Sequence, residues 1–288
     1  MWISDYWEDF GLIDAGNGYK LERWKDVYLL RPDPQAVWKK DYENKYKNII
    51  GAKYFRSQKG GGEWKYYKKL PDDWIVKYRD LKFKVRPTGF KHTGLFPEQA
   101  VNWDFAREMI ENIKKDGKTP SVLNLFAYTG GATVACLKAG AEVCHLDASK
   151  SIVTWAKENV ALNGLSDRKI RYIVDDADKF VRREIKRGNK YDGIIMDPPS
   201  YGRGPNGELW KIEDKIYELI SSCAKIISDS NSFMIINTYT TGLSTSVIEN
   251  ILRLTLKDGM ITSSEIGFKT ADSDLSLPCG STVRWQKR

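Results

Sequence analysis

Residues 121–131 read Ser-Val-Leu-Asn-Leu-Phe-Ala-Tyr-Thr-Gly-Gly, a mostly apolar run that ends in two glycines. Such a run predicts a buried strand over Ser121–Phe126, and the residues from about Gly130 to Ala139 predict a helix behind it. Gly130 and Gly131 let the backbone turn sharply, so the amide groups at the start of the helix can face a ligand. This stretch therefore predicts a strand, a ligand-binding loop and a helix.

The rest of the chain after about residue 90 repeats this alternation of strands and helices. Further strands are expected at 141–146, 170–174, 191–196 and 232–237, followed by two final strands, with helices at 98–115, 149–163, 177–187, 212–227 and 245–256. Short loops between them predict an α/β fold with a parallel, doubly wound, Rossmann-like sheet covered on both faces. Ligands bind such sheets outside the carboxyl ends of the strands, where the strand order reverses.

The first 89 residues have a different pattern and predict a smaller β-rich domain, so we expect domains over 1–89 and 90–288. Alternating runs rich in Trp, Tyr and Val predict strands at 18–24, 27–30, 64–67, 74–78 and 81–85. Between them we expect a short helix over Gln35–Lys47 and a flexible hairpin tip at Gly60–Gly62.

Positive charge and aromatic residues are concentrated in this first part of the chain. The chain carries a net charge of +8, whereas residues 38–91 alone hold 16 basic and 6 acidic residues, a net +10, together with twelve aromatic residues. Basic side chains neutralise phosphates and exposed aromatic rings stack on unpaired bases, so the segment is a possible platform for RNA. Aromatics in a small core beneath solvated lysines would give the same composition.

Other features exclude several classes of protein. We find no run of about 18–20 apolar residues that could span a membrane, and Met1–Asp14 contains acidic but no basic residues, the reverse of a signal peptide. Four cysteines without Cys-x-x-Cys spacing fit reduced thiols, and two histidines argue against a metal centre built on histidine. We therefore expect a soluble cytoplasmic protein, an enzyme without a metal.

Acidic residues follow the expected strands at the edge where a ligand would bind. Asp147 ends the second strand, 17 positions after Gly130, and can accept hydrogen bonds from the two hydroxyls of a ribose. The pair Asp175-Asp176 ends the third strand and suits an adenine amino group, while Asp197 ends the fourth. The loop lacks the Gly-x-Gly-x-x-Gly pattern of dinucleotide sites. Its bulkier residues suit a nucleoside cofactor without pyrophosphate, such as S-adenosylmethionine.

The residues Asn124–Gly131, Asp147, Asp175-Asp176 and Asp197-Pro-Pro-Ser-Tyr201 resemble the class I S-adenosylmethionine-dependent methyltransferases. They are most similar to the bacterial 23S rRNA enzymes that form 5-methylcytosine or 7-methylguanine. Thr93–Gln99 is similar to the Gly-x-Phe-x-x-Gln segment of that group. The resemblance covers about residues 90–288 and is less specific for the substrate than for the cofactor.

This resemblance implies a set of cofactor-binding residues, with Asp147 on the ribose, Asp176 on the adenine and Asp197 beside the transferred methyl group. The residues implied against the cofactor are Gln99, Asn124, Phe126, Tyr128, Gly130, Asp147, Ser149, Asp176 and Asp197. Each also has a structural interpretation: Asn124 could bond to backbone at a strand end, Asp175 could be solvated, and Asp176 could cap the next helix.

The catalytic residues implied for the acceptor side are Asp197, Pro198, Pro199 and Tyr201. An Asp-Pro-Pro segment can accept hydrogen bonds from an amino group through the carboxylate and the Pro198 carbonyl. Ser200 stands between the prolines and Tyr201, which argues against stacking by Tyr201 on the base. Residues 202–207 are interpreted either as a mobile loop that could order over the substrate or as a plain surface loop.

Carbon methylation of cytosine would instead need a cysteine nucleophile. The related enzymes place that cysteine where this chain has Thr240, which leaves Cys279 as the alternative. We expect an RNA base methyltransferase, with rRNA as the favoured substrate. Two alternatives stay open: a methyltransferase for proteins or small molecules, and a cofactor-binding RNA assembly factor without turnover.

Overall fold

The computed structural model describes residues 1–57 and 61–287. The chain divides into two compact units: residues 1–98 with 267–279, and residues 99–266 with 280–288. The expected domain boundary between residues 89 and 90 stays a prediction. Of the expected hairpin tip Gly60–Gly62, Gly60 lies outside the described residues, and Gly62 begins a strand.

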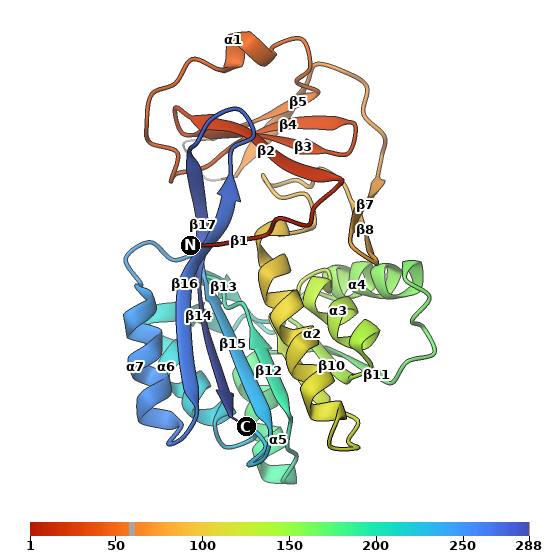
Figure 1. The fold of residues 1–288 in the computed structure, drawn as a ribbon, viewed down its shortest axis with the longest axis vertical. Helices are drawn as coiled ribbons and strands as arrows, with labels where there is room; N and C mark the ends of the chain where they lie inside the picture. Colours follow the sequence, from red (N-terminus) through yellow and green to blue (C-terminus); the bar gives the residue numbers. More distant parts are fainter. Residues whose placement is uncertain (58–60, 288) are drawn as a thin grey trace. The chain divides into compact units, whose positions relative to one another are not determined.

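The first unit is built on a five-stranded sheet in the order β2-β3-β4-β5-β6 (Figure 1). Its strands are β2 (Phe10–Gly16), β3 (Tyr19–Trp24), β4 (Val27–Pro32), β5 (Ala52–Arg56) and β6 (Gly62–Tyr66). All neighbours pair antiparallel except β4 and β5, which are parallel. Asn17 (φ 53°) and Gly18 (φ 77°) form the two-residue turn between β2 and β3, where positive φ angles are required.

A separate hairpin and a two-residue strand complete the β structure of this unit. They are β1 (Trp2–Ile3), β7 (Trp74–Tyr78) and β8 (Leu81–Val85). Sequence analysis predicted β3, β4, β6, β7 and β8 but missed β2 and β5. The expected helix over Gln35–Lys47 was wrong, because only α1 (Glu43–Tyr46) is helical.

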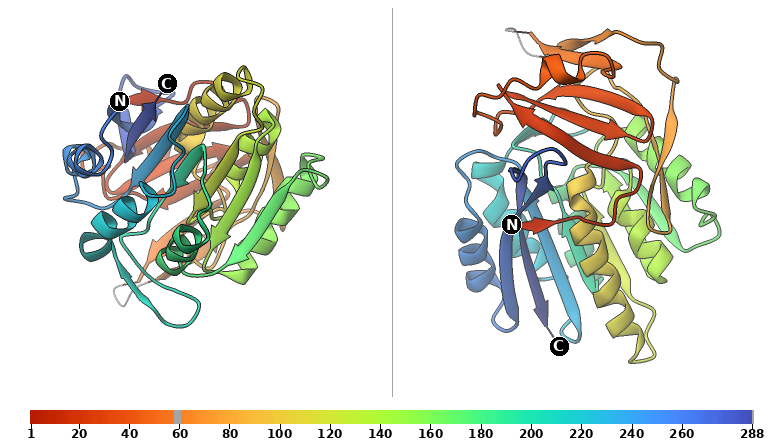
Figure 2. Two further views of the ribbon diagram at one scale, coloured as in Figure 1. Left: turned by 90° about the horizontal axis from the view of Figure 1, so that it is seen from below. Right: turned by 45° about the horizontal axis from the view of Figure 1, so that its top comes forward.

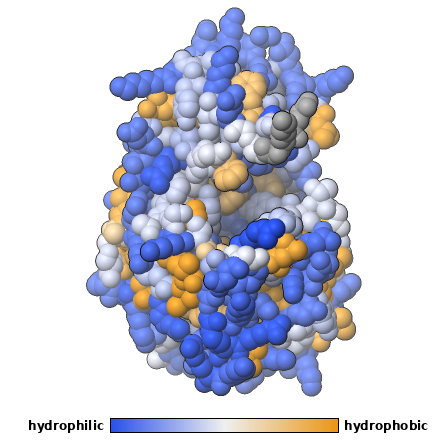
Figure 3. Space-filling model, turned by 180° about the vertical axis from the view of Figure 1, so that it is seen from behind, coloured by the Kyte–Doolittle hydropathy of each residue, from blue (hydrophilic) through white to orange (hydrophobic). Residues whose placement is uncertain are grey.

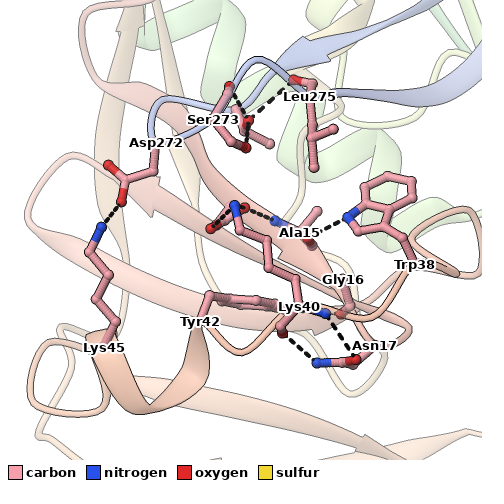
Figure 4. A network of polar contacts seen from close by, with 12 residues as sticks. Ala15, Gly16, Asn17, Trp38, Lys40, Tyr42, Lys45, Asp272, Ser273 and Leu275 are labelled. Atoms are coloured by element: carbon pink, nitrogen blue, oxygen red, sulfur yellow. Dashed lines mark hydrogen bonds and ion pairs between the residues drawn. The ribbon is translucent and has the colours of Figure 1, made fainter.

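The residues before α1 extend along β2 and β3 because their backbone groups find partners there. The amides of Asn17 and Gly18 donate to the carbonyls of Trp38 and Ala36, both over 2.8 Å. The Trp38 indole donates to the Ala15 carbonyl, and Lys40 pairs with Asp14 (Figure 4). In the same network Lys45 pairs with Asp272 of the segment 267–279, which belongs to this unit.

The second unit contains most of the expected doubly wound sheet, which has eight strands in the order β1-β16-β17-β15-β12-β9-β10-β11. Besides β1, the strands of this sheet are β9 (Ser121–Leu125), β10 (Glu142–Asp147), β11 (Ile170–Val174), β12 (Gly193–Met196), β15 (Ser232–Thr238), β16 (Met260–Lys269) and β17 (Ser276–Lys287). The end of β16 and the start of β17 belong to the segment 267–279 of the first unit. The pairs from β15 to β11 are parallel, whereas β17 is antiparallel to β15, so the sheet is mixed. The strand order reverses at β9, which lies between β10 and β12.

Helices cover both faces of this sheet (Figures 1 and 2). One face carries α2 (Ala100–Lys114), α3 (Gly131–Ala139) and α4 (Lys150–Leu162), and the other carries α5 (Ala177–Arg187), α6 (Ile212–Cys223) and α7 (Thr245–Thr255). A 3₁₀ turn over Pro97–Gln99 precedes α2. A continuous apolar core joins the sheet to α5, α6 and α7. This packing confirms the expected fold class.

Residues 202–207, expected to be a mobile loop, belong to a short hairpin. Its strands β13 (Tyr201–Arg203) and β14 (Leu209–Lys211) pair antiparallel. The Gly204 amide donates to the Glu208 carbonyl over 2.8 Å and closes the turn. Gly202 and Arg203 thus lie in a strand and residues 204–207 form the turn of the hairpin, while the expected mobility of this loop stays a prediction.

The surface seen in Figure 3 is mainly hydrophilic, and its hydrophobic residues form separate patches. Among residues 1–57 and 61–287, no helix is long and apolar enough to cross a membrane.

Candidate active site at the carboxyl ends of the strands

The loop between β9 and α3 has an unusual backbone. Phe126 (φ 53°), Tyr128 (φ 50°) and Gly130 (φ 87°) all lie in the left-handed region. For a residue with a side chain this conformation costs about 1–3 kcal/mol, and such strain persists only where surrounding contacts impose it. Because the loop follows the strand at which the sheet order reverses, its strain indicates a ligand-binding position.

Three hydrogen bonds hold this loop in place. The Ala127 amide donates to the Leu146 carbonyl over 2.9 Å, and the Tyr128 amide donates to Asp147 Oδ2 over 3.0 Å. On the other side, the buried Asn159 of α4 donates to the Thr129 carbonyl over 2.8 Å. Sequence analysis missed Asn159, since no local pattern connects it with a loop 30 residues away.

The Asp147 carboxylate accepts hydrogen bonds from two loops. Its Oδ2 accepts from Tyr128, and its Oδ1 accepts from the Ser149 amide over 2.9 Å. Burial raises the pKa of this carboxyl group, and the hydrogen bonds from these backbone amides oppose the shift. Each carboxylate oxygen has a further lone pair, so the group can also accept from two ribose hydroxyls. Ser149 lies at the start of α4, as expected.

Asn124 is buried and takes part in a chain of polar contacts inside the unit. Its Nδ2 donates to Thr133 Oγ1, which is 2.9 Å from His145 Nδ1. Burial lowers the pKa of His145 to about 3, so this imidazole is neutral near pH 7. The contact from Asn124 to Thr133 gives Asn124 a structural role, connecting β9 to α3.

The acidic pair after β11 has partners in α5. Asp175 Oδ1 accepts from the Asp176 amide over 2.8 Å, and its Oδ2 pairs with Arg183. Asp176 Oδ1 accepts from the Lys179 amide over 2.9 Å and caps α5, as one of the two interpretations expected. This cap uses one carboxylate oxygen of Asp176.

The Asp197-Pro198-Pro199 segment follows β12, adjacent to β9. The Asp197 amide donates to the Leu125 carbonyl over 3.4 Å, so the two loops begin together. Trp210 of β14 donates from its indole to the Pro199 carbonyl over 2.6 Å, and its ring centroid lies 5.0 Å from that of Phe126. Trp210 thus joins both loops, a role that its position in the sequence did not indicate.

Tyr201 and Gln99 differ in their surroundings. Tyr201 lies in β13 with 60% of its surface exposed. Gln99 is buried, accepts from Asn102 Nδ2 over 3.1 Å and donates from Nε2 to Tyr239 Oη over 2.8 Å. Gln99 is therefore part of a hydrogen-bonded network with residues after β15, which sequence analysis did not foresee.

Cys279 lies in the segment 267–279 of the first unit. Its thiol is 3.8 Å from the Leu277 carbonyl, and burial raises its pKa above the ordinary value. A raised pKa disfavours the thiolate that a nucleophile needs. Thr240, at the position where the related enzymes have a cysteine, instead makes a hydrogen bond of 2.6 Å with Ser200.

The second unit gathers the predicted residues of the strand ends at one edge of its sheet. Carboxylates follow β10, β11 and β12, and the strained loop follows β9. These donor and acceptor groups fit a nucleoside with a ribose and an amino group, and they include no cluster suited to a cation. Among the described residues, no group of three His, Cys, Asp or Glu side chains could hold a metal ion. The fold and the site define a doubly wound α/β protein that binds a nucleoside cofactor.

Comparison with known proteins agrees with this class. The chain belongs to the S-adenosylmethionine-dependent methyltransferase family, whose model matches residues 44–239. The expected resemblance and its cofactor, S-adenosylmethionine, are thus confirmed.

Two curated relatives and two solved structures illustrate the similarity. The chain is 33% identical over 217 residues to the ribosomal RNA large subunit methyltransferase K/L of Shewanella frigidimarina, a match covering 75% of this chain and 28% of that protein. It is 26% identical to the methyltransferase K of Neisseria meningitidis, covering 74% of this chain and 61% of that one. The chain thus spans less than two thirds of these relatives.

An S-adenosylmethionine-dependent methyltransferase from Agrobacterium tumefaciens, known from a crystal structure, is 35% identical in sequence, with a TM-score of 0.93. That match covers 99% of this chain and 93% of the other. A protein from Streptococcus mutans is 16% identical, with a TM-score of 0.75. That match covers 98% of this chain and 76% of the other, and it shows only that the fold is shared.

Proposed function

We propose that the protein transfers a methyl group from S-adenosylmethionine to a base in RNA, with rRNA as the favoured substrate. The observation that carries this proposal is the position of Asp197-Pro198-Pro199 directly beside the strained loop at the reversal of the sheet. This arrangement supports an acceptor site for the substrate next to the groups that we assign to the cofactor, as an in-line transfer requires.

We assign the cofactor to the loop and to the carboxylates around it. Asp147 would bind the ribose and Asp176 the adenine, while Gln99, Asn124, Phe126, Tyr128, Gly130 and Ser149 would line the rest of the site. Bound there, S-adenosylmethionine supplies an electrophilic methyl group on a sulfonium. Positioning and exclusion of water by the protein supply much of the catalysis.

On the acceptor side, the Asp197 carboxylate would accept a hydrogen bond from an amino group of the base. The Pro199 carbonyl already accepts from Trp210, so we assign the second acceptor to the Pro198 carbonyl. Such contacts hold the base while its reacting atom faces the methyl group. Tyr201 is assigned to the edge of the acceptor site, with the exposed ring able to contact the surrounding nucleotide.

The names of the curated relatives support RNA as the substrate, since both proteins are named as rRNA methyltransferases. The first unit also bears on the substrate, through the aromatic residues that its core does and does not bury. Of the twelve aromatic residues in 38–91, Tyr42, Tyr54, Trp74, Tyr78 and Phe83 are buried in its core. Their burial accounts for part of the aromatic content without any partner.

Other aromatic side chains of the same segment are exposed around the β5–β6 hairpin. Phe55, Tyr66 and Tyr67 have 38%, 54% and 49% of their surface exposed. Described residues 52–57 and 61–69 hold five basic residues and one acidic residue, a net +4. Exposed rings and positive charge together fit a surface that binds unpaired RNA.

Lys53 and Lys65 lie directly opposite each other in this hairpin. Like charges at such positions destabilise an antiparallel pair. The Lys53 ammonium lies 5.3 Å from the Phe55 ring centroid and pairs with Glu43, and the Lys65 ammonium lies 5.5 Å from the Tyr67 ring. A polyanion bound along the hairpin would offset the remaining repulsion.

Methyl transfer to rRNA from cells that lack the gene tests the proposal. Radiolabelled methyl groups should appear in RNA, whereas label on protein alone would reject the RNA substrate. Asp197→Ala should lower transfer at least about 100-fold, a larger loss than its effect on cofactor affinity, because it removes the group that positions the base. Full function of this variant would favour a cofactor-binding assembly factor. We also place the protein in the cytoplasm, which the four cysteines free of disulfides support.

A further inference from the structure

A short hairpin follows the Asp-Pro-Pro segment directly in the sequence. Its strands β13 and β14 pair antiparallel in one register, in which the opposite residues are Tyr201 and Lys211, Gly202 and Trp210, and Arg203 and Leu209. Side chains directly opposite each other lie on the same face, and successive residues of a strand point to opposite faces. The hairpin therefore has an inner face, which carries Trp210, and an outer face.

The inner face attaches the hairpin to the active site. Trp210 is buried, and its indole donates to the Pro199 carbonyl over 2.6 Å. The centroid of its ring lies 5.0 Å from that of Phe126 in the strained loop. At the base of the hairpin, the Ile212 amide donates to the Ser200 carbonyl over 3.1 Å. These contacts hold the hairpin beside the Asp-Pro-Pro segment.

The turn at the end of the hairpin is closed by Glu208. Its Oε2 accepts from the Asn206 amide over 2.9 Å, and its backbone carbonyl accepts from the Gly204 amide over 2.8 Å. The same carboxylate pairs with Lys179 of α5. Because Lys179 balances this negative charge, the turn does not oppose the approach of an anion.

The outer face consists of four exposed side chains, two of them cationic and none acidic: Tyr201, Arg203, Leu209 and Lys211. Leu209 has 53% of its surface exposed, and Tyr201 is exposed to a similar extent. The Lys211 ammonium lies 3.9 Å from Asp214, which is also exposed. An ion pair of this kind on the surface is weak, so Lys211 can exchange it for a phosphate.

This combination of groups fits a strand of RNA. An enzyme that modifies a base of folded RNA must hold that base outside the stack, together with the strand beside it. Cationic side chains follow the phosphates of such a strand, and exposed rings stack on its bases whatever their sequence. Tyr201 comes only two positions after Pro199, so the outer face begins where the acceptor segment ends.

We propose that the outer face of the β13–β14 hairpin binds the RNA strand next to the acceptor base. In this arrangement Arg203 and Lys211 contact phosphates, and the ring of Tyr201 stacks on the neighbouring base. Leu209 covers the edge of that base. The inference rests on the proposed function and adds to it a surface in the second unit that holds the strand, while the Asp-Pro-Pro segment holds the acceptor base.

Arg203→Gln with Lys211→Met removes both charges of the outer face. With rRNA from cells lacking the gene, we expect KM to rise about 10-fold and kcat to stay within about twofold of wild type. The salt dependence of KM should become shallower, because two phosphate contacts are lost. The melting temperature and the dissociation constant for S-adenosylmethionine should not change, since neither side chain contacts the core or the cofactor loop.

Two further pairs of substitutions separate this surface from net charge. Arg203→Lys with Lys211→Arg keeps both charges and should retain most of the RNA affinity. Arg168→Gln with Lys225→Met is the matched control, because both residues are exposed and precede β11 and β15, away from the carboxyl ends of the strands. The control should have the wild-type KM.

Tyr201 variants test the stacking contact. Tyr201→Ala should raise KM about 10-fold, and Tyr201→Phe, which keeps the ring, should raise it much less. Equal effects of the two substitutions would overturn the stacking role of Tyr201.

A wild-type KM in Arg203→Gln with Lys211→Met would overturn the inference, as would an equal rise in the control pair. A rise in KM accompanied by a lower melting temperature and a weaker cofactor affinity would also overturn it, because that result indicates a structural role. If the wild-type protein labels no RNA, the proposed function and this inference fail together. RNA labelling with a wild-type KM in the hairpin variants overturns the inference alone.

Discussion

Asp147 Oδ2 accepts a hydrogen bond of 3.0 Å from the backbone amide of Tyr128, a residue with a φ angle of 50°. The carboxylate at the end of β10 thereby stabilises the strained loop after β9. In our proposal the same side chain also offers acceptors to the cofactor. Replacing it would then remove two contributions to cofactor binding.

Asp147→Ala should weaken S-adenosylmethionine binding about 10- to 100-fold, since a hydrogen bond to a charged group contributes about 1.5–3 kcal/mol. Isothermal titration calorimetry measures this change. Asp167→Ala, at an exposed carboxylate, is the control and should leave the affinity unchanged. An unaltered affinity in Asp147→Ala would remove Asp147 from the cofactor site.

The pH dependence of binding offers a separate prediction. Burial raises the pKa of Asp147 above its ordinary value of 3.8. The carboxylate therefore gains a proton at a higher pH than an exposed aspartate does, and cofactor affinity should fall as the pH drops through this raised pKa. Titrations between pH 4 and 7 check the expected direction, and Asp147→Asn should lose that dependence. If the affinity of the wild-type protein did not change over this pH range, the assignment of Asp147 to the cofactor site would be contradicted.

The sequence identified the strand ends because their residues follow a local pattern. Apolar runs that stop at Asp147 and Asp197 fix both a strand and the edge at which it ends. The contacts that complete the site are not local. Gln99 and Tyr239, which share a hydrogen bond, are 140 positions apart in the sequence.

One local expectation failed. The segment 35–47 was expected to be a helix, but the carbonyls of Trp38 and Ala36 accept hydrogen bonds from the β2–β3 turn instead. There, tertiary contacts outweighed a short sequence pattern.

Cys279→Ser tests the chemistry of the acceptor. Because burial raises the pKa of this thiol, we expect no thiolate attack, and methyl transfer should stay within about twofold of wild type. Transfer to rRNA at pH 7 is the measurement. Loss of transfer with intact cofactor affinity and melting temperature would instead support covalent carbon methylation through Cys279.

The β5–β6 hairpin provides a test of RNA binding that does not involve catalysis. Lys65→Met with Lys68→Met removes two charges from exposed side chains of this region while retaining most of each apolar stem. RNA affinity should fall, and the slope of log K against log salt should decrease by about 1.4, from ~0.7 per phosphate contact on a single strand. Filter binding of rRNA at several salt concentrations measures both. Lys39→Met with Lys186→Met is the matched control. An equal loss of RNA affinity in this control would show that the net charge of the protein, and not the hairpin, causes the effect.

The stability of the first unit depends on a buried ion pair between β3 and β4. Arg31 Nε and Nη2 donate to both carboxylate oxygens of Glu22, over 2.6 and 2.7 Å. Burial would raise the pKa of Glu22, but the charges of Arg31 and Lys20 and the hydrogen bonds from Arg31 and Trp24 outweigh it and lower this pKa to about 2.

Arg31→Met leaves the Glu22 carboxylate buried without its main partner and should destabilise the protein by about 3–5 kcal/mol. Replacing both residues, Glu22→Gln with Arg31→Met, should cost less than Arg31→Met alone. Because the pKa of Glu22 is lowered on folding, its contribution is present above the ordinary value of 4.5 and is lost as the pH falls towards 2. Urea unfolding between pH 7 and 2.5 measures both effects, and Glu22→Gln should show a weaker acid dependence than wild type. If the double variant were less stable than Arg31→Met, the loss of stability would come from losing the ion pair and not from the unpaired carboxylate of Glu22.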